Sequence, residues 1–113
     1  KQHDGEGEPV AAGTGRKSDQ LPAVYAYKPV PDNVTNPEWK KHYIGVQATF
    51  WTEHVSDINY FNYLAYPRLL AVAEAAWSPE EKKDFEDFRT RFTADTILFD
   101  LTGRLYGKHF IAK

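Results

Sequence analysis

Residues 43–51, YIGVQATFW, are the stretch that decides how this chain folds. Nearly every position is apolar, with Gln47 and Thr49 as the exceptions. Such a run is typical of a parallel β-strand covered on both faces, because a strand with one wet face alternates more regularly. A parallel strand needs hydrogen-bonding neighbours, and the rest of the chain offers no second strand of equal quality. We therefore expect its neighbours to come from elsewhere.

The residues after this strand predict helices. Residues 58–77, INYFNYLAYPRLLAVAEAAW, are apolar around much of a helical circumference, and Ser56 or Asp57 is placed to cap the start. Pro67 lies inside the run and removes a backbone hydrogen bond. We therefore expect two helical pieces, with a kink or a fresh start at Pro67.

A further helix is predicted from about Pro79. The sequence SPEE at residues 78–81 supplies an N-cap, a proline at the first helical position and a capping-box glutamate. The buried stripe of this helix is expected to comprise Phe85, Phe88 and Phe92. Its charged residues are expected on the solvent side, and they are Lys82, Lys83, Glu86, Asp87 and Arg89.

The two ends of the chain carry loop signals. Residues 1–20 hold four of the seven glycines and show no apolar periodicity, which indicates a glycine-rich acidic loop. Four prolines between residues 21 and 37 leave room for a turn or two of helix at residues 23–28. Gly103 is placed to end the last helical stretch. The order loop, buried strand, helices is typical of the last βα unit of a larger α/β protein.

The composition excludes several classes of function. The chain has 113 residues and a formal net charge of −2, so no concentrated basic surface for nucleic acid is expected. Cysteine is absent, which excludes disulfides and thiolate metal sites, and the four histidines show no metal-ligand spacing. No run of about 18 apolar residues could span a membrane. Methionine is absent even at the first position, so we expect a piece of a longer protein.

The polar end of the predicted strand is the candidate binding site. Side chains alternate along a strand, and ligands of α/β proteins bind where parallel strands end. Trp51 and Glu53 fall at that end, two residues apart on one face. An indole that stacks on a pyranose, beside a carboxylate that accepts from its hydroxyls, is the chemistry of sugar recognition. From spacing alone, a core tryptophan and a turn-capping glutamate are an equally good interpretation. The two expected faces are Gln47, Thr49, Trp51 and Glu53 on one side and Val46, Ala48 and Phe50 on the other.

Three longer stretches carry a family resemblance. They are GVQATFWTEHV at residues 45–55, NYLAYPRLLAVAEAAWSPEEKKDFEDF at 62–88 and VYAYKPVP at 24–31. Together they resemble the C-terminal part of the family 20 glycoside hydrolases, the β-N-acetylhexosaminidases and chitobiases. In that family the eighth barrel strand reads G-x-Q-x-x-x-W-x-E and the eighth helix carries PRLLAxAExxWS. The resemblance covers roughly residues 21–107.

The resemblance implies an α/β fold in which this chain is a C-terminal fragment of a TIM (β/α)8 barrel. A complete barrel needs about 250 residues, so the chain would supply the eighth strand and its helices and would not be a complete barrel alone. Residues 1–20 would be a loop outside the resemblance, and residues 21–113 would be the C-terminal part of the catalytic barrel.

For function, the resemblance implies an exo-β-N-acetylhexosaminidase that removes terminal β-linked N-acetylhexosamine with retention. The substrate's own acetamido group is the nucleophile in this family. The catalytic Asp-Glu pair follows the fourth strand, so no catalytic residue is expected in this segment, and neither metal nor cofactor is implied. Trp51 would form the floor of the terminal sugar subsite, and Glu53 would accept hydrogen bonds from the outer hydroxyls. Arg68 and Glu74 match motif positions, with structural roles in ion pairs expected.

The implied partners are a glycan that contains N-acetylhexosamine and the remainder of the barrel, with neither nucleic acid nor a membrane span. The compartment stays open, although enzymes that act on glycans are often exported. One alternative is a non-catalytic interaction or carbohydrate-binding module, because an apolar strand without neighbours leaves adhesive surfaces. Another is a different barrel glycosidase in which Glu53 is itself catalytic; the longer resemblance argues against it.

Overall fold

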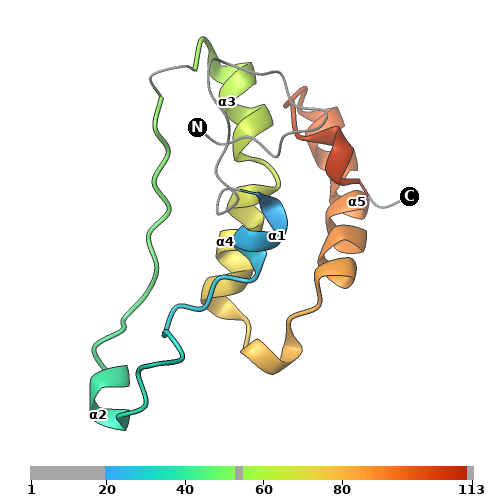
Figure 1. The fold of residues 1–113 in the computed structure, drawn as a ribbon. Coiled ribbons are helices and arrows are strands. Elements are labelled where there is room, and N and C mark those ends of the chain that lie inside the picture. Colours follow the sequence, from blue (N-terminus) through green and yellow to red (C-terminus); the bar gives the residue numbers. More distant parts are fainter. Residues whose placement is uncertain (1–19, 53–54, 112–113) are drawn as a thin grey trace.

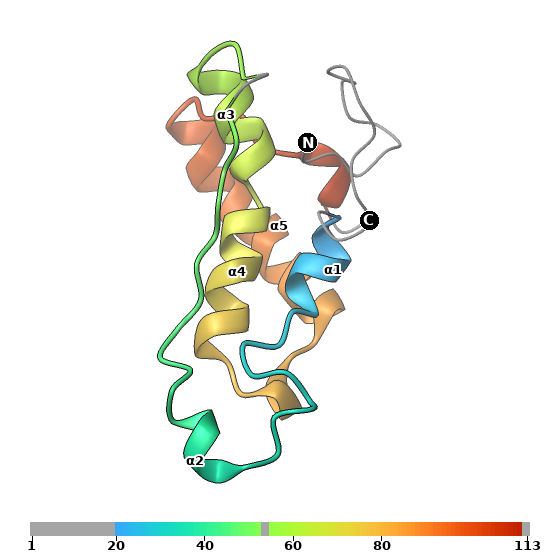
Figure 2. The same cartoon turned by 60° about the vertical axis from the view of Figure 1, so that its left-hand side comes forward.

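The computed structural model describes residues 20–52 and 55–111, and its architecture is helical (Figure 1). Two helices, α4 and α5, run side by side, and the short α1 lies against α4 (Figures 1 and 2). In chain order the elements are α1 (Leu21–Tyr25), α2 (Pro37–Lys40), α3 (Ile58–Ala65), α4 (Arg68–Trp77), the 3₁₀ turn η2 (Glu80–Lys82), α5 (Phe85–Leu101) and the 3₁₀ turn η3 (Lys108–Phe110).

The core is aromatic and lies between α1, α4, α5 and the C-terminal segment. Phe92 is 2% exposed, and its ring meets those of Phe99 and Tyr106 edge-on with centroids 6.1 and 5.9 Å apart. At the other end of α5, the ring of Tyr25 lies 5.0 Å from that of Phe88. Rings at these separations add attraction to the burial of apolar area. The buried cluster comprises Leu21, Tyr25, Ala71, Phe88, Phe92, Tyr106 and Phe110. The predicted stripe on this helix is thus confirmed, with Phe85 partly buried against the cluster.

The predicted break at Pro67 is confirmed. The carboxylate of Asp57 caps α3 by accepting from the backbone N–H groups of Asn59 and Tyr60 at 2.8 and 3.0 Å. Helix α3 ends before Pro67, which follows a cis peptide bond, and α4 begins at Arg68. Of the two residues predicted as candidates for this cap, Ser56 and Asp57, the structure has Asp57.

The predicted helix start at Pro79 is wrong. Pro79 has ψ 142°, which is extended backbone, and only the single turn η2 follows. Ser78 ends α4 instead of starting a helix, because its N–H donates to the carbonyl of Glu74. Helix α5 begins at Phe85, where the Asp84 carboxylate accepts from two free backbone N–H groups at the helix start. The two possible caps, Ser78 and Asp84, lie six residues apart. The helix begins at Asp84, which places Phe85 against the core.

The helix end at Gly103 is confirmed. Its φ of 64° is left-handed, a conformation that glycine adopts without penalty. The N–H of Gly103 donates to Asp100 and that of Arg104 to Phe99, which closes the last carbonyls of α5 in a Schellman-type turn. The short helix expected at residues 23–28 is present as α1, two residues earlier.

Lys83 and Arg89, both predicted on the solvent side of the helix from Pro79, have largely buried side chains instead. The Lys83 side chain is 5% exposed, because its ammonium donates to the carbonyl of Tyr27 and pairs with Glu80. Arg89 turns toward the C-terminal segment and donates to two of its carbonyls. In both residues the apolar stem of the side chain is buried while its charged end pairs with a polar group. Helical periodicity alone does not predict this arrangement.

The strand predicted at residues 43–51 is not formed within the described part of the chain. Residues 44–52 carry neither helix nor strand pairing and run as the long extended stretch between α2 and α3 (Figure 1). A strand exists only when a second strand satisfies its backbone N–H and C=O groups. The expected eighth barrel strand is therefore unconfirmed, and the fold seen here is the helical part alone. None of the described helices has the length and apolarity to cross a bilayer.

Candidate functional site

The extended segment has one face toward the helices. Phe50 is half-buried, and its ring lies 4.6 Å from that of Phe61 on α3. Val46 is half-buried as well, whereas Gln47 and Thr49 are exposed. This alternation follows the two faces expected of a strand, except that Ala48 of the apolar face is also exposed.

A hollow of about 390 Å³ lies between this segment and the helices. Residues 47–50 form one wall, and Phe61, Arg68 and Leu69 belong to the opposite wall. The lining is mainly apolar, with Arg68 as its one charged member, so the hollow has the character of an unfilled packing layer. Trp51 does not line it.

Trp51 is 69% exposed at the end of the extended segment. Directly after it the chain turns, with the N–H of Val55 donating to the carbonyl of Thr52 at 3.0 Å, and then enters α3. The indole is thus not a core residue of this helical unit. Glu53, the other predicted sugar-binding residue, lies outside the described residues, and the joint orientation of the pair stays a prediction.

The start of α3 holds a hydrogen-bonded carboxylate close to this turn. Backbone N–H donation by Tyr60, together with the hydroxyl of Ser56, keeps the pKa of Asp57 below its usual value. The ionised cap secures the first turn of α3, the helix whose Phe61 contacts Phe50. It therefore helps to place the segment that ends at Trp51.

The expected structural role of Glu74 in ion pairing is confirmed. Its carboxylate, on α4, accepts from the Tyr25 hydroxyl of α1 at 2.8 Å and from the Arg91 guanidinium of α5 at 2.7 Å. Three helices thus meet at one side chain that is 12% exposed. Arg91 also pairs with Asp87 at 2.7 Å on its own helix.

The electrostatics of this three-helix node follow from its geometry. Burial, and then the hydrogen bond to the Glu74 carboxylate, raise the pKa of Tyr25 to about 12. Hydrogen bonds to Glu74 and Asp87 raise the pKa of Arg91, which stays charged in any case. The node is therefore an ion pair beside a neutral phenol, and it joins the three helices.

Arg68 also has the structural role expected of it, although it does not pair with Glu74. It is 6% exposed and donates to the Leu64 carbonyl at 2.9 Å, which joins α4 to the end of α3. Its guanidinium lies 5.5 Å from the ring centroid of Phe110, within cation–π range. A carbonyl and an aromatic face are thus among the partners of this buried charge.

The two histidines in the described part of the chain, His42 and His109, do not belong to a cluster of metal-ligand type. Among the described residues, 20–52 together with 55–111, no three His, Cys, Asp or Glu side chains lie close enough to hold a metal ion. His42 is exposed, and the Nδ1 of His109 lies 3.4 Å from the Tyr63 hydroxyl.

Phe61 is the residue at this site that the sequence pattern did not single out. Its only signal was its place on an apolar run four residues after the cap.

Comparison with known proteins identifies relatives that match between 44% and 88% of the chain. The model of the glycosyl hydrolase family 20 catalytic domain matches residues 2–80. A β-hexosaminidase of Porphyromonas gingivalis is 43% identical over 100 residues, which is 88% of this chain and 12% of that protein. A β-hexosaminidase of Akkermansia muciniphila is 46% identical over 50 residues, 44% of this chain and 10% of that protein. A β-N-acetylhexosaminidase of Cellulomonas fimi is 38% identical over 60 residues, 53% of this chain and 12% of that protein.

Two features of these matches matter. The chain spans about a tenth of the length of each of these relatives. The family match begins at residue 2 and so includes the glycine-rich segment, for which the sequence motifs showed no counterpart. It ends at residue 80, before α5 and the C-terminal segment.

Proposed function

The chain belongs to family 20 of the glycosyl hydrolases, and on that premise we propose that it is part of an exo-β-N-acetylhexosaminidase. The enzyme removes a terminal β-linked N-acetylhexosamine from a glycan. The substrate's acetamido oxygen attacks the anomeric carbon, a protein carboxylic acid protonates the leaving oxygen, and water then opens the cyclic intermediate with net retention. The Asp-Glu pair that assists these steps lies outside this chain.

Residues 21–113 contribute the closing part of the barrel, with residues 43–51 as its eighth strand. In a barrel, one face of each strand packs on the outer helices and the other faces the interior. Phe50 lies against Phe61 of α3 and Val46 is half-buried, while Gln47, Ala48, Thr49 and Trp51 are exposed. The exposed face is the one that would turn inward once the neighbouring strands are in place. The loop predicted at residues 1–20 lies, apart from Gln20, outside the described residues.

In this proposal Trp51 and Glu53 bind the terminal sugar. The pyranose C–H face stacks on the indole of Trp51, and the outer hydroxyls donate to the Glu53 carboxylate in charge-assisted hydrogen bonds. The observation that carries the proposal is the exposure of Trp51, 69%, at the carboxyl end of a segment whose other face is packed on helices. A core tryptophan would be buried in the same unit.

Kinetics of the enzyme that contains this chain test the proposal. For Glu53→Gln we expect kcat/KM for a chromogenic N-acetylglucosaminide to fall by the equivalent of about 1–3 kcal/mol, the range for a hydrogen bond to a charged group. Trp51→Ala should lower it further, since an aromatic platform is lost. Matched controls are Glu38→Gln and Trp39→Ala on α2, both exposed and placed before the amino end of the segment, whereas Trp51 lies at its carboxyl end. Unchanged kinetics in both test variants would remove the pair from the sugar site.

The isolated 113-residue chain provides the complementary test. It should not hydrolyse the same substrate, because the acid and most of the pocket wall are outside it. Sugar binding without hydrolysis by the isolated chain would instead support a carbohydrate-binding module. Hydrolysis that depends on Glu53 would support the third interpretation, in which this carboxylate is catalytic.

A further inference from the structure

The C-terminal segment, residues 107–111, contacts α3, α4 and the junction between them. The N–H of Gly107 donates to the carbonyl of Tyr66 at 3.0 Å, in the junction itself. The ring of His109 faces Tyr63 of α3, with Nδ1 3.4 Å from the hydroxyl. Phe110 lies beneath the Arg68 guanidinium of α4. We call residues 107–111 the C-terminal clamp.

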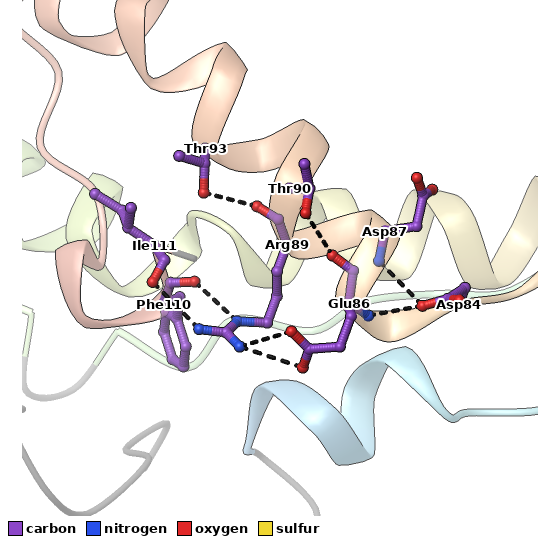
Figure 3. A network of polar contacts seen from close by, with 8 residues as sticks. All are labelled: Asp84, Glu86, Asp87, Arg89, Thr90, Thr93, Phe110 and Ile111. Carbon is purple, nitrogen blue, oxygen red and sulfur yellow. Dashed lines mark hydrogen bonds and ion pairs between the residues drawn. The ribbon is translucent and has the colours of Figure 1, made fainter. Parts of the chain in front are cut away.

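Arg89 holds the clamp to α5. Its Nε and Nη2 donate to the carbonyls of Phe110 and Ile111, each at 3.2 Å, while Nη1 pairs with Glu86 at 2.9 Å (Figure 3). The planar guanidinium places its donors in a rigid fork, so one side chain sets the position of two consecutive peptide groups. Gly107 allows the close approach, since an added Cβ would lie 2.8 Å from the Phe110 ring.

A series of contacts through α3 connects the clamp to the proposed sugar site. Arg68, under which Phe110 packs, donates to the Leu64 carbonyl at the end of α3. One helical turn earlier, Phe61 supports Phe50, and Phe50 precedes Trp51. The last residues of α3, Leu64 and Ala65, are its buried ones, whereas the residues before them are half-buried or exposed. Loosening the buried end of a short helix allows the rest of the helix to move.

We propose that Arg89 and Phe110 are positioning residues for the terminal sugar subsite, acting through α3 and the Phe61–Phe50 contact on Trp51. This inference rests on the proposed function, and it assigns a role in substrate binding to residues beyond the part of the chain that the family model matches. In this proposal the clamp does not contact the substrate. It sets the position of the Trp51 indole on which the sugar stacks.

The test compares Phe110→Ala with Tyr25→Phe in the enzyme that contains this chain. Phe110→Ala empties the space under Arg68, whereas Tyr25→Phe removes the hydroxyl that donates to Glu74, six residues further along α4. Both should lower the Tm. Displacing a binding group by less than 1 Å already weakens productive binding, so Phe110→Ala should raise KM roughly threefold to tenfold with a smaller change in kcat. Tyr25→Phe should leave KM unchanged.

A second measurement needs no catalysis. Hydrogen exchange of the α3 amides, read in peptides that span residues 58–65, should accelerate in Phe110→Ala and stay at the wild-type rate in Tyr25→Phe. Should Phe110→Ala fail to fold, Arg89→Lys carries the test. It keeps the charge beside Glu86 but loses the fork on the two carbonyls.

The outcomes separate this inference from the proposed function. A KM within about twofold of wild type and unchanged α3 exchange, in a clamp variant with a lowered Tm, would make the clamp purely structural. That result overturns the inference while Trp51→Ala still reports on the sugar site. Faster α3 exchange together with a raised KM supports the inference. If Trp51→Ala itself leaves KM unchanged, the proposed function fails first, and the positioning role fails with it.

Discussion

The aromatic core and the extended segment are built from similar residues, yet the most apolar side chains of the segment are exposed and those of the core are buried. Leu21 and Phe92 in the core are 0% and 2% exposed, whereas Ile44 and Trp51 in the segment are 97% and 69% exposed. A helix satisfies its own backbone hydrogen bonds, so α4 and α5 need only side-chain contacts to be stable. The segment needs backbone partners as well, and hydrophobicity alone does not supply them. The contrast teaches that apolar character predicts burial only where the hydrogen-bonding partners lie in the same chain.

The sharpest way to break this comparison is to empty the core. Phe92→Ala should lower the free energy of unfolding by about 3–5 kcal/mol, because a fully buried ring is replaced by a cavity. Denaturant unfolding measures the loss. The matched change Phe50→Ala removes a half-buried ring whose aromatic contact is with Phe61, and it should cost clearly less. Equal costs would mean that the extended segment is as much a part of the core as α5.

The next largest effect is expected at the three-helix node. Glu74→Gln keeps the shape of the side chain but leaves Arg91 without its buried partner, although Asp87 still accompanies the guanidinium. Because Arg91 is half-exposed, solvent screens part of the loss, and about 1–3 kcal/mol of stability should disappear. Glu38→Gln, which disturbs only an exposed pair with Lys41, is the control and should lie within about 0.5 kcal/mol of wild type. A neutral result at Glu74 would show that packing alone holds the three helices.

The same node predicts a smaller effect that depends on pH. The pKa of Tyr25 is raised to about 12 in the folded chain from 10.0, so both the folded and the unfolded states hold the proton below pH 10. Between about pH 10 and 12 the unfolded state loses the proton first, and the stability contributed by this phenol falls as pH rises. Wild type should therefore lose stability faster than Tyr25→Phe across this window. Parallel pH profiles of the two proteins would contradict the raised pKa.

The smallest effect is expected at the most exposed apolar side chain. Ile44→Ala should change the stability of the 113-residue chain by no more than about 0.5 kcal/mol, because the side chain already contacts solvent. In the assembled enzyme the same substitution should cost more, since the proposed barrel would bury Ile44. Thermal unfolding of both forms measures the difference. A large cost in the isolated chain would show that the segment packs without the barrel.

Several helix boundaries were predictable because each depends on a few neighbouring residues. Asp57 caps its own helix, Pro67 interrupts the run that contains it, and Gly103 adopts the left-handed turn that ends α5. The start of α5 was not predictable in the same way. Two capping signals, at Ser78 and Asp84, are locally equivalent, and contacts with α1 decide between them.

The candidate site was predictable only in part. Trp51 and its motif pointed to a sugar platform, and its exposure is consistent with that role. Phe61 beneath the segment and the Arg89–Phe110 clamp behind α3 were not predictable, because their partners lie 11 and 21 residues away. Such contacts depend on how helices pack, and no local spacing encodes that.

The sequence by itself determined the family, the break between α3 and α4, and the aromatic stripe of α5, because motif order, proline chemistry and helical periodicity are properties of short stretches. Only the tertiary structure decided that Glu74 joins three helices, that Lys83 and Arg89 turn inward, and that the segment ending at Trp51 runs extended without strand pairing. These outcomes depend on partners distant along the chain or outside it, and a side chain or a strand acquires its environment only when those partners are in place.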